Sequence, residues 1–297
     1  MKVGFRITKS HQEFIVEIEV LEFEFGGIIM FYEAKEGKVK VDRTDMDYVT
    51  FGRGQKPFII IPGLGDGLKT VKGTKIMLAR MYKLFAKEYK VYVFSRKNNI
   101  EEGYSTRDMA EDQKIAMENL GIKNAYIMGV SQGGMICQYL AIDYPEMVDK
   151  LVIGVSVSKQ NEIMQKVIKN WITLAENNDY RNLIIDTMEK TFTEDKLKKY
   201  RVLYPIITRV GKPKNFNRLI VQANACLNHN AYDELDKIKC STLVIGGDND
   251  KVVGENASEE MAIRINKSKL ILYKGLGHGA YEEAKDFNQQ VLSFLIS

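Results

Sequence analysis

Short runs of consecutive hydrophobic residues recur along this chain, separated by longer segments in which hydrophobic positions repeat every three to four residues. Unbroken apolar runs are typical of strands buried on both faces of a parallel sheet. Such strands are predicted at 57–61, 91–95, 125–130, 151–157, 242–247 and 269–274. Helical spacing covers 73–88, 106–120 and a segment that ends before Tyr144-Pro145. This alternation predicts an α/β fold with a mainly parallel central sheet flanked by helices.

The pattern is less regular before residue 57. Residues 31–33, 38–41 and 47–51 are predicted as three short strands. Residues 1–29 are predicted to be an N-terminal extension, in which the alternation of apolar and polar positions changes phase. A second hypothesis is that translation naturally begins at Met30, because the codons of Gly26-Gly27 can spell a ribosome-binding GGAGG. The nucleotide sequence would decide between these two interpretations.

No strand pattern is found between Ser158 and Asp236, where several segments have helical spacing. We therefore predict a core domain made of residues 30–157 and 237–297, with an inserted helical cap at 158–236. Residues 159–218 hold 13 Lys and Arg against 7 Asp and Glu, while the whole chain has a formal charge of +4. A solvated helical surface is the more frequent explanation for such a balance, and attraction of an anionic substrate or carrier is the alternative.

A serine flanked by glycines follows the strand at 125–130 and precedes a helical segment. The pattern Gly129-x-Ser131-x-Gly133 is that of a nucleophile elbow, a tight turn that exposes a serine hydroxyl at the end of a parallel strand. The two glycines are expected to be needed because strand and helix nearly touch across such a turn. A helix-packing turn with an idle serine is the competing interpretation.

A base and an acid are required to activate such a serine. Among the three histidines, His278 is preferred because it follows the last predicted strand, whereas His11 lies in the extension and His229 in the cap. The orienting acid is expected in the loop after the preceding strand. Asp250 is preferred there, and Asp248 remains an alternative.

The loop Pro62-Gly63-Leu64-Gly65-Asp66-Gly67 follows the strand at 57–61. A dinucleotide-binding fingerprint would need a third glycine where Leu68 stands, so this loop is not interpreted as a Rossmann loop. Arg96, Asn98-Asn99 and Tyr281 are candidates for the mouth of the site, although surface or packing roles are more frequent for such residues.

These features together resemble the α/β-hydrolase superfamily, in particular small cap-bearing serine esterases, acyl-carrier methyl-ester esterases and cofactor-free haloperoxidase-like members. The resemblance covers about residues 30–297 and rests on the chain order of Ser131, Asp250 and His278 and on the sequence around each. It implies that the backbone N–H groups of Gln132 and Leu64 form the oxyanion hole. Where the family often has His-Gly before the second donor, this chain has Pro62-Gly63.

Composition and charge argue against several classes of protein, namely nucleic-acid-binding, membrane-spanning and metal-binding proteins. The charge of +4 and the lack of a basic run with interleaved aromatics argue against a nucleic-acid partner. No apolar stretch is long enough for a membrane span, and a cytoplasmic location is expected. Three scattered cysteines suggest reduced thiols, and no residue pattern suggests a zinc or calcium site, so no cofactor or metal is predicted.

The sequence thus predicts a serine hydrolase that cleaves a carboxylic ester or related acyl bond through an acyl-enzyme. Its substrate is expected to be a small-molecule ester, anionic or carrier-bound if the cap charge matters. A perhydrolase, a lactonase or a carbon–carbon hydrolase with the same triad is the alternative. A non-catalytic ligand-binding member of the fold is the second alternative.

Overall fold

The computed structural model describes residues 33–297. The expectations for residues 1–29, for a start at Met30 and for Phe31 and Tyr32 lie outside the described residues. Residues from Phe31 onwards form one unit, which is the unit described below.

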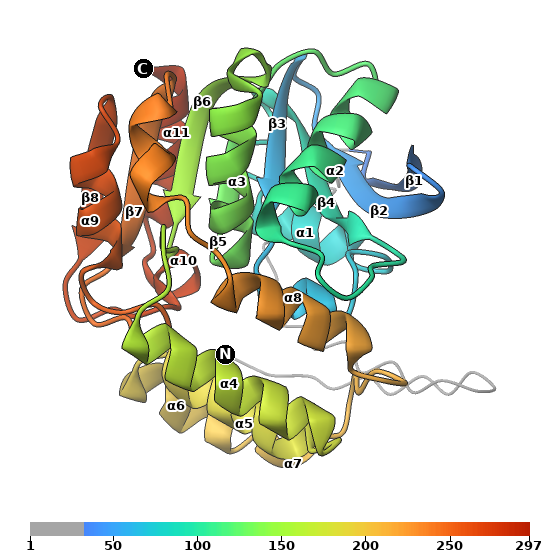
Figure 1. Ribbon diagram of the computed structural model, residues 1–297, viewed down its shortest axis with the longest axis vertical. Coiled ribbons are helices and arrows are strands. Elements are labelled where there is room, and N and C mark those ends of the chain that lie inside the picture. The colour runs from blue at the N-terminus through green and yellow to red at the C-terminus, as the bar shows by residue number, and fades with distance from the viewer. Residues whose placement is uncertain (1–32) are drawn as a thin grey trace, which may run out of the picture. The chain divides into compact units, whose positions relative to one another are not determined.

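A sheet of eight strands in the order β1-β2-β4-β3-β5-β6-β7-β8 forms the centre of this unit (Figure 1). Its strands are β1 (Lys35–Val41), β2 (Thr44–Phe51), β3 (Lys56–Ile61), β4 (Tyr89–Lys97), β5 (Ala125–Val130), β6 (Val148–Gly154), β7 (Ser241–Gly247) and β8 (Ser268–Tyr273). The β1–β2 and β2–β4 pairs are antiparallel, and every other neighbouring pair is parallel. The predicted mainly parallel sheet flanked by helices is therefore confirmed.

Helices cover both faces of the sheet. They are α1 (Lys75–Met81), α2 (Thr106–Asn119), α3 (Gln132–Asp143), α9 (Ala257–Arg264), α10 (Ala280–Glu283) and α11 (Phe287–Ile296). Short 3-10 helices are η1 (Leu64–Gly67), η2 (Pro145–Met147) and η3 (Tyr232–Lys237). Successive residues of β3 belong to opposite faces: Ile59 packs with α2 and α3, and Phe58 packs with α1 and α11. Burial on both faces explains why these strands are continuous apolar runs.

The helix expected at 73–88 is only half right. Helix α1 ends at Met81, and residues up to Glu88 form turns. These turns have bonds to the third residue back, such as Phe85 N–H to Tyr82 O at 3.0 Å. The carbonyl of Ala86 accepts the N–H of Arg53 at 2.9 Å, so it is used to hold the chain after β2. The apolar spacing of this segment reflects packing against β2 and β3 rather than a continuous helix.

Between β6 and β7 the described chain has helices and only an isolated bridge between Lys159 and Asn230. The helices are α4 (Glu162–Glu176), α5 (Tyr180–Thr191), α6 (Glu194–Arg201), α7 (Tyr204–Ile207) and α8 (Asn217–Leu227). In Figure 1, α8 lies between the carboxyl ends of the central strands and the layer formed by α4 to α7. The buried face of α4, which includes Met164 and Trp171, packs in one cluster with Leu64 and Val252 of the sheet-edge loops.

Candidate active site

Ser131 occupies a strained turn between β5 and α3. Its backbone angles are φ 55° and ψ −120°, a combination that side-chain-bearing residues rarely adopt. A Cβ at Gly133 would lie 1.9 Å from the carbonyl oxygen of Ile61, and one at Gly129 would lie 2.2 Å from the carbonyl oxygen of Gly133. Backbone fills both positions, so only glycine fits without rearrangement of the turn.

The structure brings Ser131, His278 and Asp250 together. His278 Nε2 lies 3.0 Å from Ser131 Oγ, and His278 Nδ1 lies 2.8 Å from Asp250 Oδ2. With the proton on Nδ1, the imidazole donates to Asp250 and its Nε2 is free to accept from the serine hydroxyl. His278 and Asp250 are buried, and Ser131 is partly exposed. This geometry is that of a nucleophile, its base and the orienting acid.

The carboxylate of Asp250 is itself fixed. Its Oδ1 accepts the backbone N–H groups of Val252 at 2.8 Å and Val253 at 3.0 Å, which leaves Oδ2 for His278. Asp248, the other acid considered, accepts the N–H of Gly275 at 2.7 Å and holds the turn after β8. Of the two acids, the structure therefore places Asp250 against the imidazole.

Of the other histidines, His11 lies outside the described residues, and His229 is buried in the protein interior. His229 is 1% exposed, and its Nδ1 lies 2.9 Å from Thr106 Oγ1. Burial lowers the pKa of His229 to about 3, so this imidazole is neutral near pH 7. Its ring lies edge-on to that of Tyr139, with the ring centroids 5.3 Å apart.

The proposed oxyanion donors Leu64 and Gln132 each occupy the first position of a helical turn. In η1 the first internal bond runs from Asp66 N–H to Gly63 O, so the N–H of Leu64 has no partner within that turn. Gln132 begins α3, where the first amides likewise lack internal partners. A Cβ at Gly63 would lie 3.6 Å from Ser131 Oγ, so this loop passes directly beside the serine.

A closed ring of hydrogen bonds, formed by buried polar side chains and two main-chain groups, includes the side chain of Gln132 and that of Asp66 in the loop of Leu64. Arg96 Nη2 donates to Gln132 Oε1 at 2.7 Å, and Gln132 Nε2 donates to the carbonyl of Gln222 at 2.8 Å. Gln222 Nε2 donates to Asp66 Oδ2 at 3.2 Å, which also accepts the N–H of Arg96 at 3.3 Å. Arg218 completes the charge balance of Asp66 with an ion pair at 2.7 Å.

Sequence reasoning did not find this ring. Arg96 was considered for the mouth of the site, but its side chain is fully buried. Asp66 lies in the glycine-rich loop at 62–67 and Gln222 lies in no motif, and nothing in the sequence indicates that these two residues, 156 positions apart, form a pair.

The helices between β6 and β7 contact each of the loops that carry the site. Asn161, the N-cap of α4, donates from Nδ2 to the carbonyl of Val253 at 2.7 Å. The carbonyl of Thr191 at the end of α5 accepts the N–H of Gly279 at 2.7 Å, one residue after His278. Beside it, the carboxylate of Glu283 accepts the N–H of Thr193 at 3.0 Å.

Other chemistries find little support among residues 33–297. Cys137 and Cys226 are buried, and burial raises the pKa of both thiols, that of Cys226 to about 12. No group of three or more His, Cys, Asp and Glu side chains within this part of the chain could hold a metal ion. Its helices include none with the length and apolar character needed to cross a bilayer.

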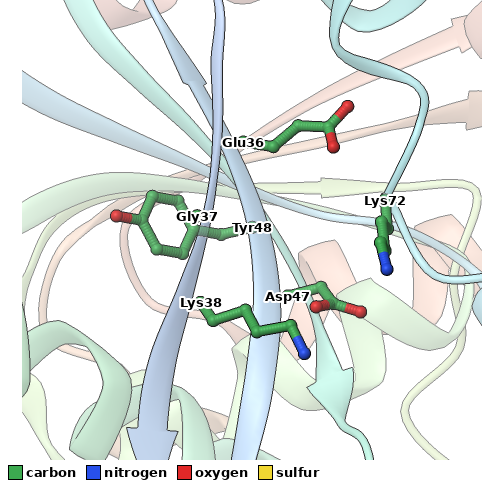
Figure 2. Close-up of a pocket in the computed structure, with 6 residues that line it drawn as sticks. All are labelled: Glu36, Gly37, Lys38, Asp47, Tyr48 and Lys72. Atoms are coloured by element: carbon green, nitrogen blue, oxygen red, sulfur yellow. The ribbon is translucent and has the colours of Figure 1, made fainter.

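A cavity of about 290 Å³ lies at the antiparallel edge of the sheet (Figure 2). Its lining residues come from β1, β2 and the segment before α1 and are Glu36, Gly37, Lys38, Asp47, Tyr48 and Lys72. None of them is Ser131, Asp250 or His278, and none belongs to the loop at 62–67 or to the ring of hydrogen bonds around Arg96.

Residues 56–285 match the family model of the alpha/beta hydrolase fold. The chain belongs to this family. The α/β hydrolase has relatives named 2-hydroxy-6-oxononadienedioate/2-hydroxy-6-oxononatrienedioate hydrolase in Pseudomonas sp. and in Escherichia coli O139:H28. The Pseudomonas relative is 27% identical over 193 residues, 63% of this chain and 68% of the relative. The E. coli relative is 26% identical over 264 residues, 82% of this chain and 88% of the relative.

Among solved structures, the enol-lactonase from Burkholderia xenovorans LB400 superimposes on this α/β hydrolase with a TM-score of 0.74. The two are 19% identical, and the match covers 88% of this chain and 100% of that one. At this identity the likeness concerns the fold alone. The family and the names of the sequence relatives support hydrolase activity for this chain.

Proposed function

We propose that this α/β hydrolase is a serine hydrolase in which Ser131 is the nucleophile, His278 the general base and Asp250 the acid that orients the imidazole. The observation that carries the proposal is the continuous contact from Ser131 Oγ through both nitrogens of His278 to Asp250 Oδ2, at 3.0 and 2.8 Å. The first distance allows proton transfer from the serine hydroxyl to the imidazole, and the second is that of a hydrogen bond that orients the ring.

The reaction proceeds in two steps. Ser131 Oγ attacks a carbonyl carbon while His278 Nε2 takes its proton, and the charge on the imidazolium is balanced by Asp250. The N–H groups of Leu64 and Gln132 hold the oxyanion, and the protonated His278 then donates its proton to the leaving group. Water activated by His278 attacks the acyl-enzyme, which releases the acid and regenerates Ser131.

Two substrate classes fit this chemistry. The relatives are named for compounds that contain a 6-oxo group and two carboxylates but no ester. The hydrolytic cleavage of such a skeleton by a serine nucleophile takes place at a carbon–carbon bond beside the ketone. We propose this carbon–carbon cleavage of an oxo-dicarboxylate as the first candidate reaction, and hydrolysis of a small carboxylic ester as the second. The excess of 13 Lys and Arg over 7 Asp and Glu in residues 159–218 favours an anionic substrate in either case.

We further propose that residues 158–236 act as a cap over a core formed by residues 30–157 and 237–297. This division is supported by the run of helices between β6 and β7 and by their contacts with the site loops. The cap would then limit which substrates reach Ser131. A cytoplasmic location and the absence of a cofactor remain predictions.

A substrate panel tests the proposal. It contains a 2-hydroxy-6-oxo-dienedioate, followed by the loss of its conjugated chromophore, together with p-nitrophenyl esters and lactones of graded length. Ser131→Ala is the control and is expected to fold normally and to lose turnover of every substrate. Residual turnover by pure Ser131→Ala protein would contradict the role of Ser131.

A fluorophosphonate probe separates an enzyme from a non-catalytic binding protein. An activated Ser131 is expected to react stoichiometrically, and Ser131→Ala is expected to remain unlabelled. Failure of the wild-type protein to react would favour the ligand-binding alternative.

A further inference from the structure

Arg96 at the end of β4 is a buried cation whose partners are unusual. Its side chain is fully buried, and Nη2 donates to the carbonyl of Pro62 at 2.6 Å and to Gln132 Oε1 at 2.7 Å. The carboxylate of Asp66 pairs with Arg218 rather than with this guanidinium. Nε and Nη1 of Arg96 have no hydrogen-bond partner among the described residues.

A cation in such a place is costly. Removing a charge from water is unfavourable, and replacement by an apolar side chain of similar size often stabilises a protein. Burial lowers the pKa of Arg96, although a guanidinium stays protonated in proteins. A residue that served only to fill this space would not need a charge, so the two groups that Arg96 holds are the natural explanation.

Both groups belong to the segments that carry the oxyanion donors. Pro62 stands two residues before Leu64, and its carbonyl accepts a hydrogen bond from the guanidinium of Arg96. Gln132 supplies the other donor from its main chain, while its side chain is held between Arg96 and the carbonyl of Gln222. Two charge-assisted hydrogen bonds from Nη2 of Arg96 therefore link two segments that are 70 residues apart in the chain.

We propose that Arg96 is a positioning residue of the oxyanion hole, which fixes the Pro62 carbonyl and the Gln132 side chain so that the N–H groups of Leu64 and Gln132 converge on one point beside Ser131. This inference rests on the proposed function. Donors held in place before the reaction stabilise the developing negative charge without a cost of reorganisation.

The test measures the rate at which a fluorophosphonate reacts with Ser131, because phosphonylation also builds negative charge on an oxygen in the oxyanion hole. Arg96→Met removes the charge and both contacts, and Arg96→Lys keeps the charge but replaces the rigid planar guanidinium by a flexible ammonium. Gln132→Met removes the side-chain partner and leaves the backbone donor. Gln113→Met is the matched control, because Gln113 is equally buried and donates to Ser95 O at 3.0 Å without touching either oxyanion segment.

Misplacement of reacting groups by about 1 Å costs on the order of 100-fold in rate. We expect Arg96→Met and Gln132→Met to lower the second-order labelling constant by about 10- to 100-fold, with Arg96→Lys intermediate and Gln113→Met close to wild type. This rate constant is obtained from the time course of labelling. A loss of folded protein lowers the final amount of labelled Ser131 and leaves the rate constant unchanged. Gln132→Met retains Arg96, so it still tests the proposal if Arg96→Met does not fold.

A second measurement separates positioning from general loosening of the fold. Binding of phenylboronic acid, which forms a tetrahedral anion on Ser131, should weaken by the same factor as labelling slows. Unchanged labelling and boronate binding in Arg96→Met or Gln132→Met, with a reactive wild type, would overturn the positioning role and leave the proposed function intact. An unreactive wild type would instead overturn the proposed function, and the inference with it.

Discussion

The turn at Ser131 should store strain that can be measured as stability. A non-glycine residue at φ 55° and ψ −120° costs about 1–3 kcal/mol, and glycine adopts the same angles without a steric penalty. The informative comparison is Ser131→Gly with Ser131→Ala. Both lack the hydroxyl and its contact with His278 Nε2, so they differ only in the Cβ.

The expected difference follows from two opposing effects. Relief of strain favours glycine by about 1–3 kcal/mol. Glycine loses more backbone entropy on folding than alanine, which offsets about 0.5–1 kcal/mol of this gain. Ser131→Gly should therefore be more stable than Ser131→Ala by about 1 kcal/mol, equivalent to a shift of roughly 2 °C in Tm for a chain of this size.

Urea denaturation of both variants measures this difference in the free energy of unfolding, provided that the free energy depends on urea concentration with the same slope in both. Ser293 in α11 provides the control pair, since it is an exposed helical position. There Ser293→Gly should be less stable than Ser293→Ala by about 1 kcal/mol, the opposite sign. If Ser131→Gly were no more stable than Ser131→Ala while the control behaved as expected, the elbow would not be strained.

Two further predictions concern the acids and the buried imidazole. Asp250→Asn should lower kcat by about 10³- to 10⁴-fold because the imidazole loses its orienting charge, whereas Asp248→Asn should leave kcat nearly unchanged, and similar losses in both variants would argue against this assignment. For His229, the unfolded chain binds a proton below about pH 6.5 and the folded protein does so only near a pKa of about 3, so stability should fall as the pH drops through this window. Between pH 6.5 and 5 the loss should be about 2 kcal/mol, and His229→Gln should be free of it in urea titrations at the two pH values.

The parts of the fold that the sequence predicted well are those in which one local pattern has one structural meaning. The run at 57–61 could only be satisfied by burial on both faces, and Tyr144-Pro145 ended a helix in the structure as expected. The helix prediction at 82–88 is wrong because there the local pattern has more than one structural meaning. Tyr82, Phe85 and Ala86 have helical spacing, but the Ala86 carbonyl is needed by Arg53, a partner that lies far away in the sequence.

The site shows the same division. The proximity of Ser131 and His278 can be predicted because each stands in a loop at the end of a predicted strand, and parallel strands bring such loops to one edge. The choice between Asp248 and Asp250 stayed open, since two acids two residues apart in one loop have the same sequence signal. Only the fold shows that the Asp250 carboxylate faces His278 while that of Asp248 binds Gly275.

If residues 158–236 form the proposed cap, their contacts link substrate selection to the proposed catalytic groups. Asn161 holds the loop of Asp250 through Val253, and Thr191 holds the loop of His278 through Gly279. The third contact, from Gln222 to Asp66, reaches the loop at 62–67, which carries the proposed oxyanion donor Leu64. Because each contact lies within a few residues of a proposed catalytic group, the segment cannot move far without disturbing that group. A change in these helices that admits a larger substrate should therefore alter kcat as well as KM, which is not expected of a lid that only covers its site.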